Sequence, residues 1–346
     1  MPPPVDQTVI SRADLLARGY SDHQIRQARE RGELRSVLPG LYVRDQPAPP
    51  DDPADRHRSA LTVVVPRLAG RPVVSHLSAA ILHGLPFAHS DWDWLGRPRP
   101  GEGTGRRPAG TAGPADPPLH LTRPDAAKSR RGAALRVHSG ALDPDEVMEL
   151  AGLPVTTPER TVVDCALVLP FDHAVLLADA ALHRGLVSRP SLTRQLARLF
   201  RVPGTRRAAQ VVAFADPGSR GPGESVSRVV MSRWGLPAPL LDVAVPGPDG
   251  RSLGRAAFGF AGTRVLGVFA PDPAGTPPGG RALSGPALSG RGPSGRGPSG
   301  AEPLPHRADW VAAGWRPVVW SWPELRSPEP WIERLRSALA PAEPRS

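Results

Sequence analysis

The apolar positions nearest the N-terminus are spaced for two short helices. Ser11 can cap the first helix, which runs through Leu15 and ends at Gly19, because glycine adopts the left-handed conformation at a helix end without strain. Ser21 opens the second helix, and Gln24 three residues later completes a capping-box pattern. A helix, a sharp turn and a second helix are therefore predicted.

The second helix has one apolar side and a long polar surface. Ile25 and Ala28 face inward, and Gly32 ends the helix. Leu34–Val43 then places apolar residues on both sides of a Pro39-Gly40 turn, which is typical of a small two-stranded hairpin. Helix, turn, polar helix and hairpin in this order form the layout of a winged helix-turn-helix, predicted here for residues 1–45.

The polar side chains of this segment are the candidate DNA contacts, since long donors can reach base edges in the major groove. They are His23, Gln24, Arg26, Gln27, Arg29 and Arg35. The alternative is a helical hairpin that only packs on the rest of the protein. Charge does not decide between the two, because Ser21–Ser36 holds four arginines against three acids.

Strand and helix patterns mix between residues 56 and 215, which predicts a mixed α/β middle domain after a proline-rich acidic linker at residues 44–55. Leu119–Thr122 and Leu135–His138 alternate as two paired strands around a basic turn. Thr157-Pro158 supplies an N-cap and a first helical residue, so another helix is expected to begin there.

Three polar residues of the middle domain invite a chemical interpretation. His76 and His83 lie seven residues apart without acidic or sulfur partners, so they make a weak metal site, and packing or backbone hydrogen bonds explain them better. Asp164 has no second carboxylate nearby in the sequence and is interpreted as structural. No metal and no cofactor are predicted.

Residues 220–340 predict a helix, three strands, a helix, a strand and a final helix. The strands are expected at Leu240–Val245, Arg255–Phe260, Arg264–Phe269 and within Trp310–Trp322. This order is that of the restriction-endonuclease-like α/β core of PD-(D/E)xK nucleases. The fold class expected for the whole chain is therefore α+β, with several domains.

Composition adds two segments without structure and an ambiguous charge. The 45 prolines and 36 glycines in 346 residues exceed what packed cores need, and loops 97–118 and 270–305 are predicted to be disordered. The net charge of +10 favours a polyanion partner, but arginine-rich coding in a GC-rich genome explains part of it. Residues 181–235 hold ten arginines against two acids, a stretch that could follow DNA phosphates.

Two classes of protein are disfavoured by what the sequence lacks. No apolar run reaches 18 residues, and the first residues show no export signal, so a cytoplasmic protein without membrane insertion is predicted. The lone Cys165 excludes disulfides within the chain and cysteine-ligated metal sites.

Residues Ile10–Val43 resemble the N-terminal winged-helix domain of AbiEi-type antitoxins, from type IV toxin–antitoxin systems. The resemblance rests on Ser11-Arg12, Gly19, Ser21, Ile25, Arg26, Gly32, Arg35 and Gly40-Leu41-Tyr42. The stretches VVSHLSAAILHGLP and LPVTTPERTVVD are similar to the middle segments of the same proteins. The resemblance implies binding to double-stranded operator DNA and a nucleotidyltransferase toxin as a second partner, and it leaves a homodimer open.

The C-terminal segment resembles the very-short-patch-repair-type endonuclease domain, with the metal-binding acids missing. Ala257 stands where that family has an aspartate, and Val268 and Ala270 stand where it has an acidic pair. Glu224 alone is retained, and no lysine follows Lys128. Because a hard cation such as Mg²⁺ needs several oxygen ligands, the resemblance implies a catalytically inactive domain with Glu224 as a vestigial acid.

The leading hypothesis is a DNA-binding transcriptional regulator or antitoxin of the AbiEi type that is not an enzyme. One alternative is an active Mg²⁺-dependent endonuclease with replacement ligands, of which Asp242 is the least implausible. The other is an antitoxin that acts mainly by protein contact with a nucleotidyltransferase toxin.

Overall fold

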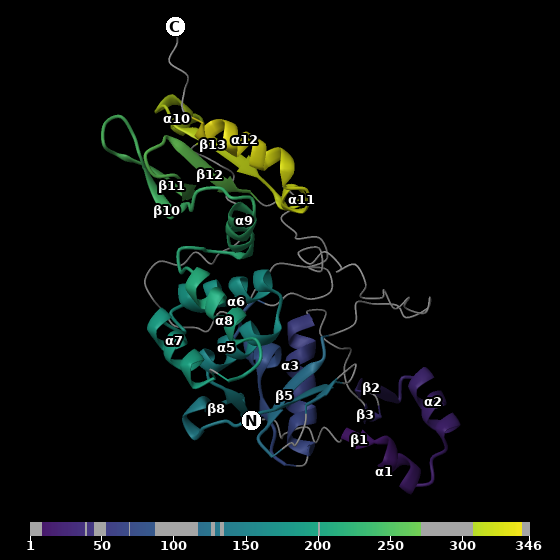
Figure 1. The fold of residues 1–346 in the computed structure, drawn as a ribbon. Coiled ribbons are helices and arrows are strands. Elements are labelled where there is room, and N and C mark those ends of the chain that lie inside the picture. The colour runs from purple at the N-terminus through teal and green to yellow at the C-terminus, as the bar shows by residue number, and fades with distance from the viewer. Residues whose placement is uncertain are drawn as a thin grey trace. The chain divides into compact units, whose positions relative to one another are not determined.

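Three β-sheets and the helices that connect them make up the described part of the chain (Figure 1). The computed structural model describes residues 9–38, 40–44, 53–68, 70–86, 117–125, 129–131, 135–199, 201–270 and 307–340. Two compact units divide between Asp164 and Cys165: one lies within Met1–His83 and Gly105–Asp164, the other within Gly84–Thr104 and Cys165–Ser346. The predicted α+β class is confirmed, and the division falls inside the segment predicted as the middle domain.

The N-terminal segment, called the head below, contains two helices and a three-stranded sheet. Its elements are β1 (Val9–Ser11), α1 (Arg12–Ala17), α2 (Asp22–Glu30), β2 (Leu34–Leu38) and β3 (Leu41–Arg44). The strands are antiparallel in the order β1-β3-β2. Both helices and the hairpin lie where the sequence predicted them, whereas β1 is additional: Ser11 ends a strand that pairs with β3.

The head has a core of its own, formed by Ile10, Leu15, Ile25, Ala28, Leu34 and Tyr42. Gly19 follows α1 with φ of +87°, the left-handed conformation that lets the chain turn sharply into α2. Ser21 and Gln24 form the predicted capping box at the start of α2. The local rules of helix ends therefore account for the turn between the two helices.

A six-stranded mixed sheet forms the rest of the first unit. Its strands are β4 (Val73–Val74), β5 (Leu119–Arg123), β6 (Arg130–Arg131), β7 (Leu135–Ser139), β8 (Val147–Leu150) and β9 (Leu153–Thr156), in the order β6-β7-β5-β4-β9-β8. The helices are α3 (Pro53–Val64), α4 (His76–Leu82) and α5 (Pro158–Val168), the last of which continues into the second unit. Short 3-10 turns cover Val65–Arg67 and Pro144–Glu146. Leu61 and Val64 of α3 pack with Leu119 and Leu121 of β5 in one apolar cluster.

Some boundaries and pairings differ from the prediction. β5 and β7 do pair, but in parallel, and a turn alone cannot join parallel strands. The residues expected to form the basic turn supply the short edge strand β6, antiparallel to β7. Helix α3 begins at Pro53, inside the predicted linker. Most of the loops predicted at 97–118 and 270–305, residues 97–116 and 271–305, lie outside the described residues.

The second unit has a helical part and a four-stranded sheet. The helical part contains α6 (Phe171–His183), α7 (Arg189–Arg198), α8 (Thr205–Phe214) and α9 (Pro222–Arg233). The sheet has the order β10-β11-β12-β13, from Leu240–Pro246, Ser252–Gly259, Val265–Phe269 and Arg316–Trp320. Its first two pairings are antiparallel and the last is parallel. α10 (Arg307–Ala312) and α12 (Glu329–Leu339) complete the predicted order, and the short helix α11 (Trp322–Arg326) is additional.

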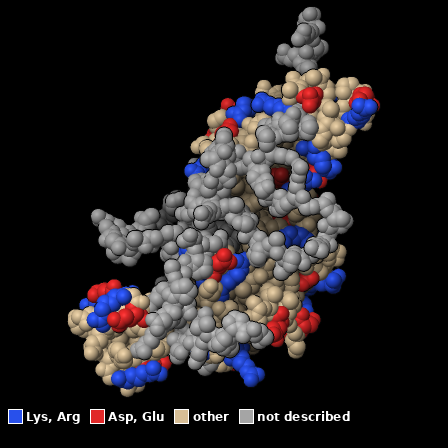
Figure 2. Space-filling view, turned by 180° about the vertical axis from the view of Figure 1, so that it is seen from behind, with Lys and Arg blue, Asp and Glu red and all other residues tan. Residues whose placement is uncertain are grey.

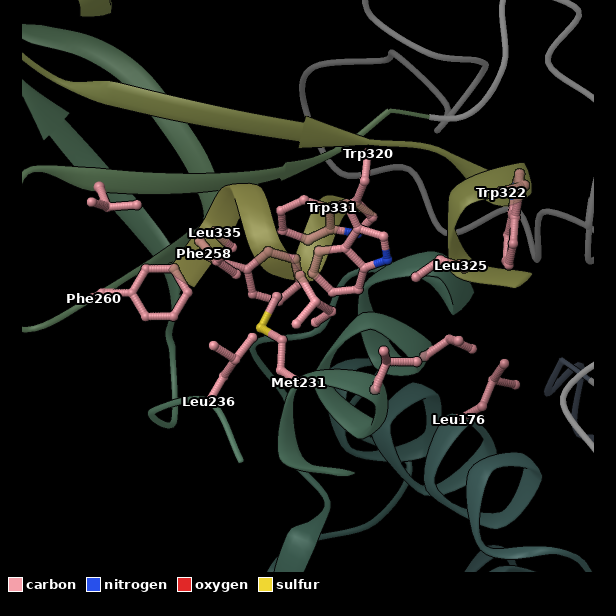
Figure 3. Close-up of a cluster of buried hydrophobic side chains, with 14 residues drawn as sticks. Leu176, Met231, Leu236, Phe258, Phe260, Trp320, Trp322, Leu325, Trp331 and Leu335 are labelled. Carbon is pink, nitrogen blue, oxygen red and sulfur yellow. The ribbon is translucent and has the colours of Figure 1, made fainter. Parts of the chain in front are cut away.

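An aromatic cluster holds this sheet to its helices (Figure 3). The rings of Trp320 in β13 and Trp331 in α12 are both fully buried and stack with centroids 4.5 Å apart. Phe258 of β11 stacks on Trp320 at 5.5 Å. Gly267 makes room for this arrangement, because a Cβ atom there would lie 2.7 Å from the Trp320 ring. None of the helices in the described residues is long and apolar enough to cross a membrane.

Candidate functional site

The polar surface of α2 is the first candidate site. Ile25 and Ala28 are buried, while the rest of α2 is exposed. At 100° per residue, His23 and Glu30 lie directly opposite the buried pair, and Arg26 and Gln27 flank them by about 50° on either side. Arg29 is exposed but lies beside Ile25, at the border of the buried side. Five of the six predicted contact residues, His23, Gln24, Arg26, Gln27 and Arg29, are thus exposed on α2, whereas the side chain of Arg35 lies outside the described part of the structure.

Gln24 serves mainly to cap the helix. Its Oε1 atom accepts a hydrogen bond from the backbone nitrogen of Ser21 at 2.8 Å, and the Ser21 hydroxyl accepts one from the Gln24 backbone nitrogen at 3.3 Å. The side chain is therefore held at the helix end. Only its amide nitrogen stays available as a donor.

The charge of the head is partly neutralised within the head. Arg12 donates to both carboxylate oxygens of Asp22 at 2.9 and 2.6 Å, and Arg31 pairs with Glu33 at 2.9 Å. Basic and acidic side chains accordingly lie next to each other on the visible face of the head, at the lower left of Figure 2. Arg26 and Arg29 are exposed and form no ion pair among the described residues, so their charges face solvent.

The arginine-rich stretch at 181–235 is used largely inside the second unit. Arg184 donates to the Gly84 carbonyl at 2.6 Å, and Arg189 donates to the carbonyl groups of residues 212, 213 and 215. Arg207, Arg220, Arg228 and Arg233 also bond to carbonyl or carboxylate oxygens of this unit. At least six of the ten arginines thus stabilise the fold, which weakens the hypothesis that the stretch follows DNA phosphates.

Among the described residues of the C-terminal domain, the acids do not gather into a group of three that could hold a cation. Glu224 accepts a hydrogen bond from the Arg220 backbone nitrogen at 2.7 Å, and burial raises the pKa of its carboxyl group. Asp242 lies between the guanidinium groups of Arg255 and Arg220, at 2.6 and 2.7 Å, and the Arg255 hydrogen bond is the main cause of its lowered pKa. Val268 is buried in an apolar cluster. In an active endonuclease a metal cation would have to bind Asp242, whose charge is already neutralised by Arg220 and Arg255.

Three histidines of the first unit come together, although the sequence pattern points to only one of them. His76 begins α4, His120 lies in β5 and His138 in β7. Thr122 pairs with His138 and His120 with Arg136, so the register places both histidines on one face of the sheet. One ring nitrogen of each histidine lies within 4.8 Å of the others.

The imidazole rings of this histidine cluster (His76, His120 and His138) are in close contact. His120 Nδ1 and His138 Nε2 are 3.1 Å apart, and the rings of His76 and His138 stack at 3.6 Å. Burial lowers the pKa of His120 to about 3 and that of His76 well below its ordinary value, and His138 lowers both further. Both rings are therefore neutral, with a lone pair on one nitrogen each.

Hydroxyl groups fix the segments around the cluster. Ser75 Oγ lies 2.9 Å from His76 Nδ1 and accepts a hydrogen bond from Thr122 at 2.7 Å. Ser78 in α4 accepts the backbone N–H of His120 at 2.7 Å. His76 itself has φ of +50°, a conformation that is uncommon outside glycine and that costs backbone strain.

A buried ionic network borders the cluster. Arg160 donates from Nε to Asp164 Oδ1 at 2.9 Å and from Nη1 to Glu146 Oε2 at 2.7 Å. The second oxygen, Asp164 Oδ2, is buried without a hydrogen-bond partner among the described residues and lies 3.9 Å from His76 Nδ1. Burial raises the pKa of Asp164 to about 6, and Arg160 opposes that rise.

In the structure His76 does not pair with His83, the partner considered from the sequence. His83 lies 2.8 Å from the Thr156 carbonyl oxygen through Nε2, which agrees with the backbone hydrogen bond expected for it. His76 instead meets His120 and His138, and Asp164 shares Arg160 with a second carboxylate that is distant in sequence. The expectation that the protein binds no metal stays a prediction. His76, His120 and His138 are the residues that could bind one.

The chain matches no model of a known protein family, and no curated protein matches it. The resemblance to AbiEi-type antitoxins therefore rests on the motifs quoted above. DNA binding and the loss of nuclease activity stay predictions, which the geometry of the two units can support.

Proposed function

We propose that this protein is a DNA-binding regulator or antitoxin of the AbiEi type that binds double-stranded DNA through a winged helix-turn-helix head. The observation that carries the proposal is the exposed face of α2. The helix is anchored by Ile25 and Ala28, follows a sharp turn at Gly19, and presents Arg26 and Gln27 on the exposed side away from its core. A helix presented in this way can enter the major groove.

The chemistry of the exposed side chains supports recognition of base edges as well as phosphates. Arginine forms bidentate hydrogen bonds with guanine, glutamine with adenine, and glutamate accepts from cytosine. Arg26, Gln27 and Glu30 supply these three groups on one face of α2. Arg29, which is exposed beside Ile25 at the border of the buried side, is suited to a phosphate contact, which positions the helix without reading sequence.

We infer further that the C-terminal domain does not cut DNA. Ala257 and Val268 provide no ligand oxygen at the positions where the resembled nucleases carry acids, and Val268 lies among apolar side chains. The salt bridges from Arg220 and Arg255 to Asp242 already satisfy the nearest candidate acid. Binding rather than cleavage is therefore the function that the arrangement of residues favours.

The test is a gel-shift titration of the full chain on the DNA upstream of its own reading frame, repeated at two salt concentrations. The double variant Arg26→Ala/Arg29→Ala should weaken binding at least about tenfold, since base recognition by one such side chain is worth about 1–3 kcal/mol. The slope of log affinity against log salt should also fall by about one for each arginine that no longer binds a phosphate.

The matched control is Arg307→Ala/Arg316→Ala, which removes the same charge from exposed positions of α10 and β13, outside both the head and the arginine-rich stretch. This control should leave the affinity nearly unchanged. Equal weakening by both double variants would show that net charge rather than α2 binds DNA. Mg²⁺-dependent plasmid cleavage that is abolished in Glu224→Ala would overturn the inference of an inactive domain.

A further inference from the structure

We propose that His76, His120 and His138 form a binding site for one divalent transition-metal ion, with Zn²⁺ as the ion to test. Among the described residues, these three form the one group of three or more histidine, cysteine or acidic side chains whose ligand atoms converge. They come from three segments, the start of α4 and the strands β5 and β7. This site is independent of the proposed DNA-binding face of α2.

The distances suit imidazole coordination of such an ion. A Zn–N bond of about 2.0–2.1 Å in tetrahedral geometry separates two ligand nitrogens by about 3.3 Å. His120 Nδ1 and His138 Nε2 are already 3.1 Å apart. The remaining nitrogen pairs, which lie within 4.8 Å, have to close by at most about 1.5 Å, which rotation of the rings out of the stack supplies.

The donor set selects the class of metal. Neutral imidazoles are ligands for Zn²⁺, Cu²⁺, Fe²⁺ and Ni²⁺, whereas Mg²⁺ and Ca²⁺ prefer oxygen. No thiolate takes part, since the only cysteine of the chain is Cys165, buried in α5. Three protein nitrogens also leave a fourth position on a tetrahedral ion for water or another small ligand.

The buried carboxylate beside the cluster provides the outer shell of such a site. Asp164 Oδ2 has no hydrogen-bond partner among the described residues and lies 3.9 Å from His76 Nδ1. A buried polar atom without a partner requires an explanation, and an ion or water in the site would give one. His76 Nδ1 lies 2.9 Å from Ser75 Oγ and 3.9 Å from Asp164 Oδ2, which leaves Nε2 as the nitrogen to bind the metal. A small shift of the ring toward Asp164 on metal binding would complete a carboxylate–histidine–zinc triad.

The experiment uses the full chain without an affinity tag, stripped of metal and titrated with Co²⁺ and then Zn²⁺. The wild-type protein should take up one Co²⁺ per chain and develop the visible absorption of a four-coordinate, nitrogen-ligated ion, which one equivalent of Zn²⁺ then removes. Because this measurement needs no variant, absence of that spectrum overturns the proposal whatever the variants do.

The variants assign the ligands. His120→Gln and His138→Gln should each weaken Zn²⁺ binding by more than the factor of about 10–100 that the loss of an outer-shell partner costs, and Asp164→Asn should fall within that range. His83→Gln is the matched control, since glutamine can still donate to the Thr156 carbonyl. Equal weakening by His83→Gln, or unchanged affinity in both cluster variants, would contradict the assignment.

Hydrogen exchange gives a readout that does not depend on affinity. A metal that joins α4, β5 and β7 stabilises the folded state in which these segments meet. Zn²⁺ should therefore slow exchange in peptides that cover residues 73–83, 117–125 and 135–139, and leave peptides of α9 unchanged. Slowing of the α9 peptides to the same extent would point to nonspecific binding instead.

Discussion

A buried ion pair in the second unit provides the sharpest test of how this fold is held together. Arg228 of α9 and Asp179 of α6 have side chains that are 9% and 1% exposed, and Arg228 Nη1 lies 2.8 Å from Asp179 Oδ2. Arg228 also donates to Ser219 Oγ at 3.2 Å and to the Phe214 carbonyl at 2.6 Å, and its guanidinium lies 4.7 Å from the Phe214 ring centre. One side chain thus joins three parts of the unit.

We expect Arg228→Met to lower the free energy of unfolding of this unit by about 3–5 kcal/mol, because it leaves the Asp179 carboxylate buried without a cation. The Asp216 backbone N–H, which donates to Asp179 at 2.7 Å, remains but cannot replace the charge. The double variant Asp179→Asn/Arg228→Met should regain most of this stability, since neither charge is then buried and the asparagine oxygen can still accept from Asp216.

The assay is urea unfolding followed by tryptophan fluorescence. All tryptophans of the described residues lie in the second unit, so the signal reports mainly on it. The midpoint should fall in Arg228→Met while the slope of free energy against urea stays the same, which indicates a change in stability rather than in the surface exposed. A destabilisation below about 1 kcal/mol, or a double variant as unstable as the single one, would refute the reasoning.

The destabilisation should also depend on pH. Burial raises the pKa of Asp179 above its unfolded value, and Arg228 opposes this rise, so the pKa should rise further in Arg228→Met. A raised folded pKa gives stability that is present below the unfolded pKa, about 3.9, and is lost as pH rises through the folded value. The difference between variant and wild type should therefore be smaller at about pH 5 than at about pH 7.5.

Three further predictions concern the head and the C-terminal sheet. Ser21→Ala should destabilise α2 by about 1 kcal/mol, seen as faster hydrogen exchange of its peptides, whereas Ser21→Asn should keep most of the cap. Val268→Glu should lower the urea midpoint of the second unit without creating Mg²⁺-dependent cleavage, because it places an unpaired carboxylate beside Trp310. The Arg255 hydrogen bond lowers the pKa of Asp242, which gives stability that is present above about pH 3.9 and lost as pH falls through the folded value. In Asp242→Asn, the free energy of unfolding, measured by urea titration at a series of pH values, should therefore fall less steeply below about pH 4 than in the wild type.

The elements that the sequence predicts correctly are those set by local rules. The start of α2 follows from Ser21 and Gln24, whose reciprocal hydrogen bonds form in the structure. Helix α5 begins at Pro158, with the Thr157 hydroxyl accepting from the Arg160 backbone nitrogen at 3.4 Å. The strands β10 to β12 alternate or run apolar as expected. In each case the signal lies within a few neighbouring residues.

Long-range pairing explains most of the differences. The three residues of β1 are too few to show alternation, and only the register with β3 makes them a strand. The direction of β5 against β7 depends on how the chain between them crosses the sheet, which no local pattern fixes. Similarly, a count of arginines at 181–235 cannot distinguish a DNA-facing stretch from side chains that bind carbonyl groups, as Arg189 does.

The histidine cluster shows what the sequence contains and what it lacks. His120 lies between the buried core residues Leu119 and Leu121 of β5, so its side chain belongs to the opposite face of the sheet. The register of β5 and β7 places His138 on that same face. The alternation of these strands can be seen in the sequence, but His76 is first considered with His83 because these two histidines are close in sequence. Only the parallel register of β5 and β7, with β4 leading directly into α4, brings the third ring to the other two. Histidines on the non-core faces of separate strands should therefore be considered as one set before any pair close in sequence is judged alone.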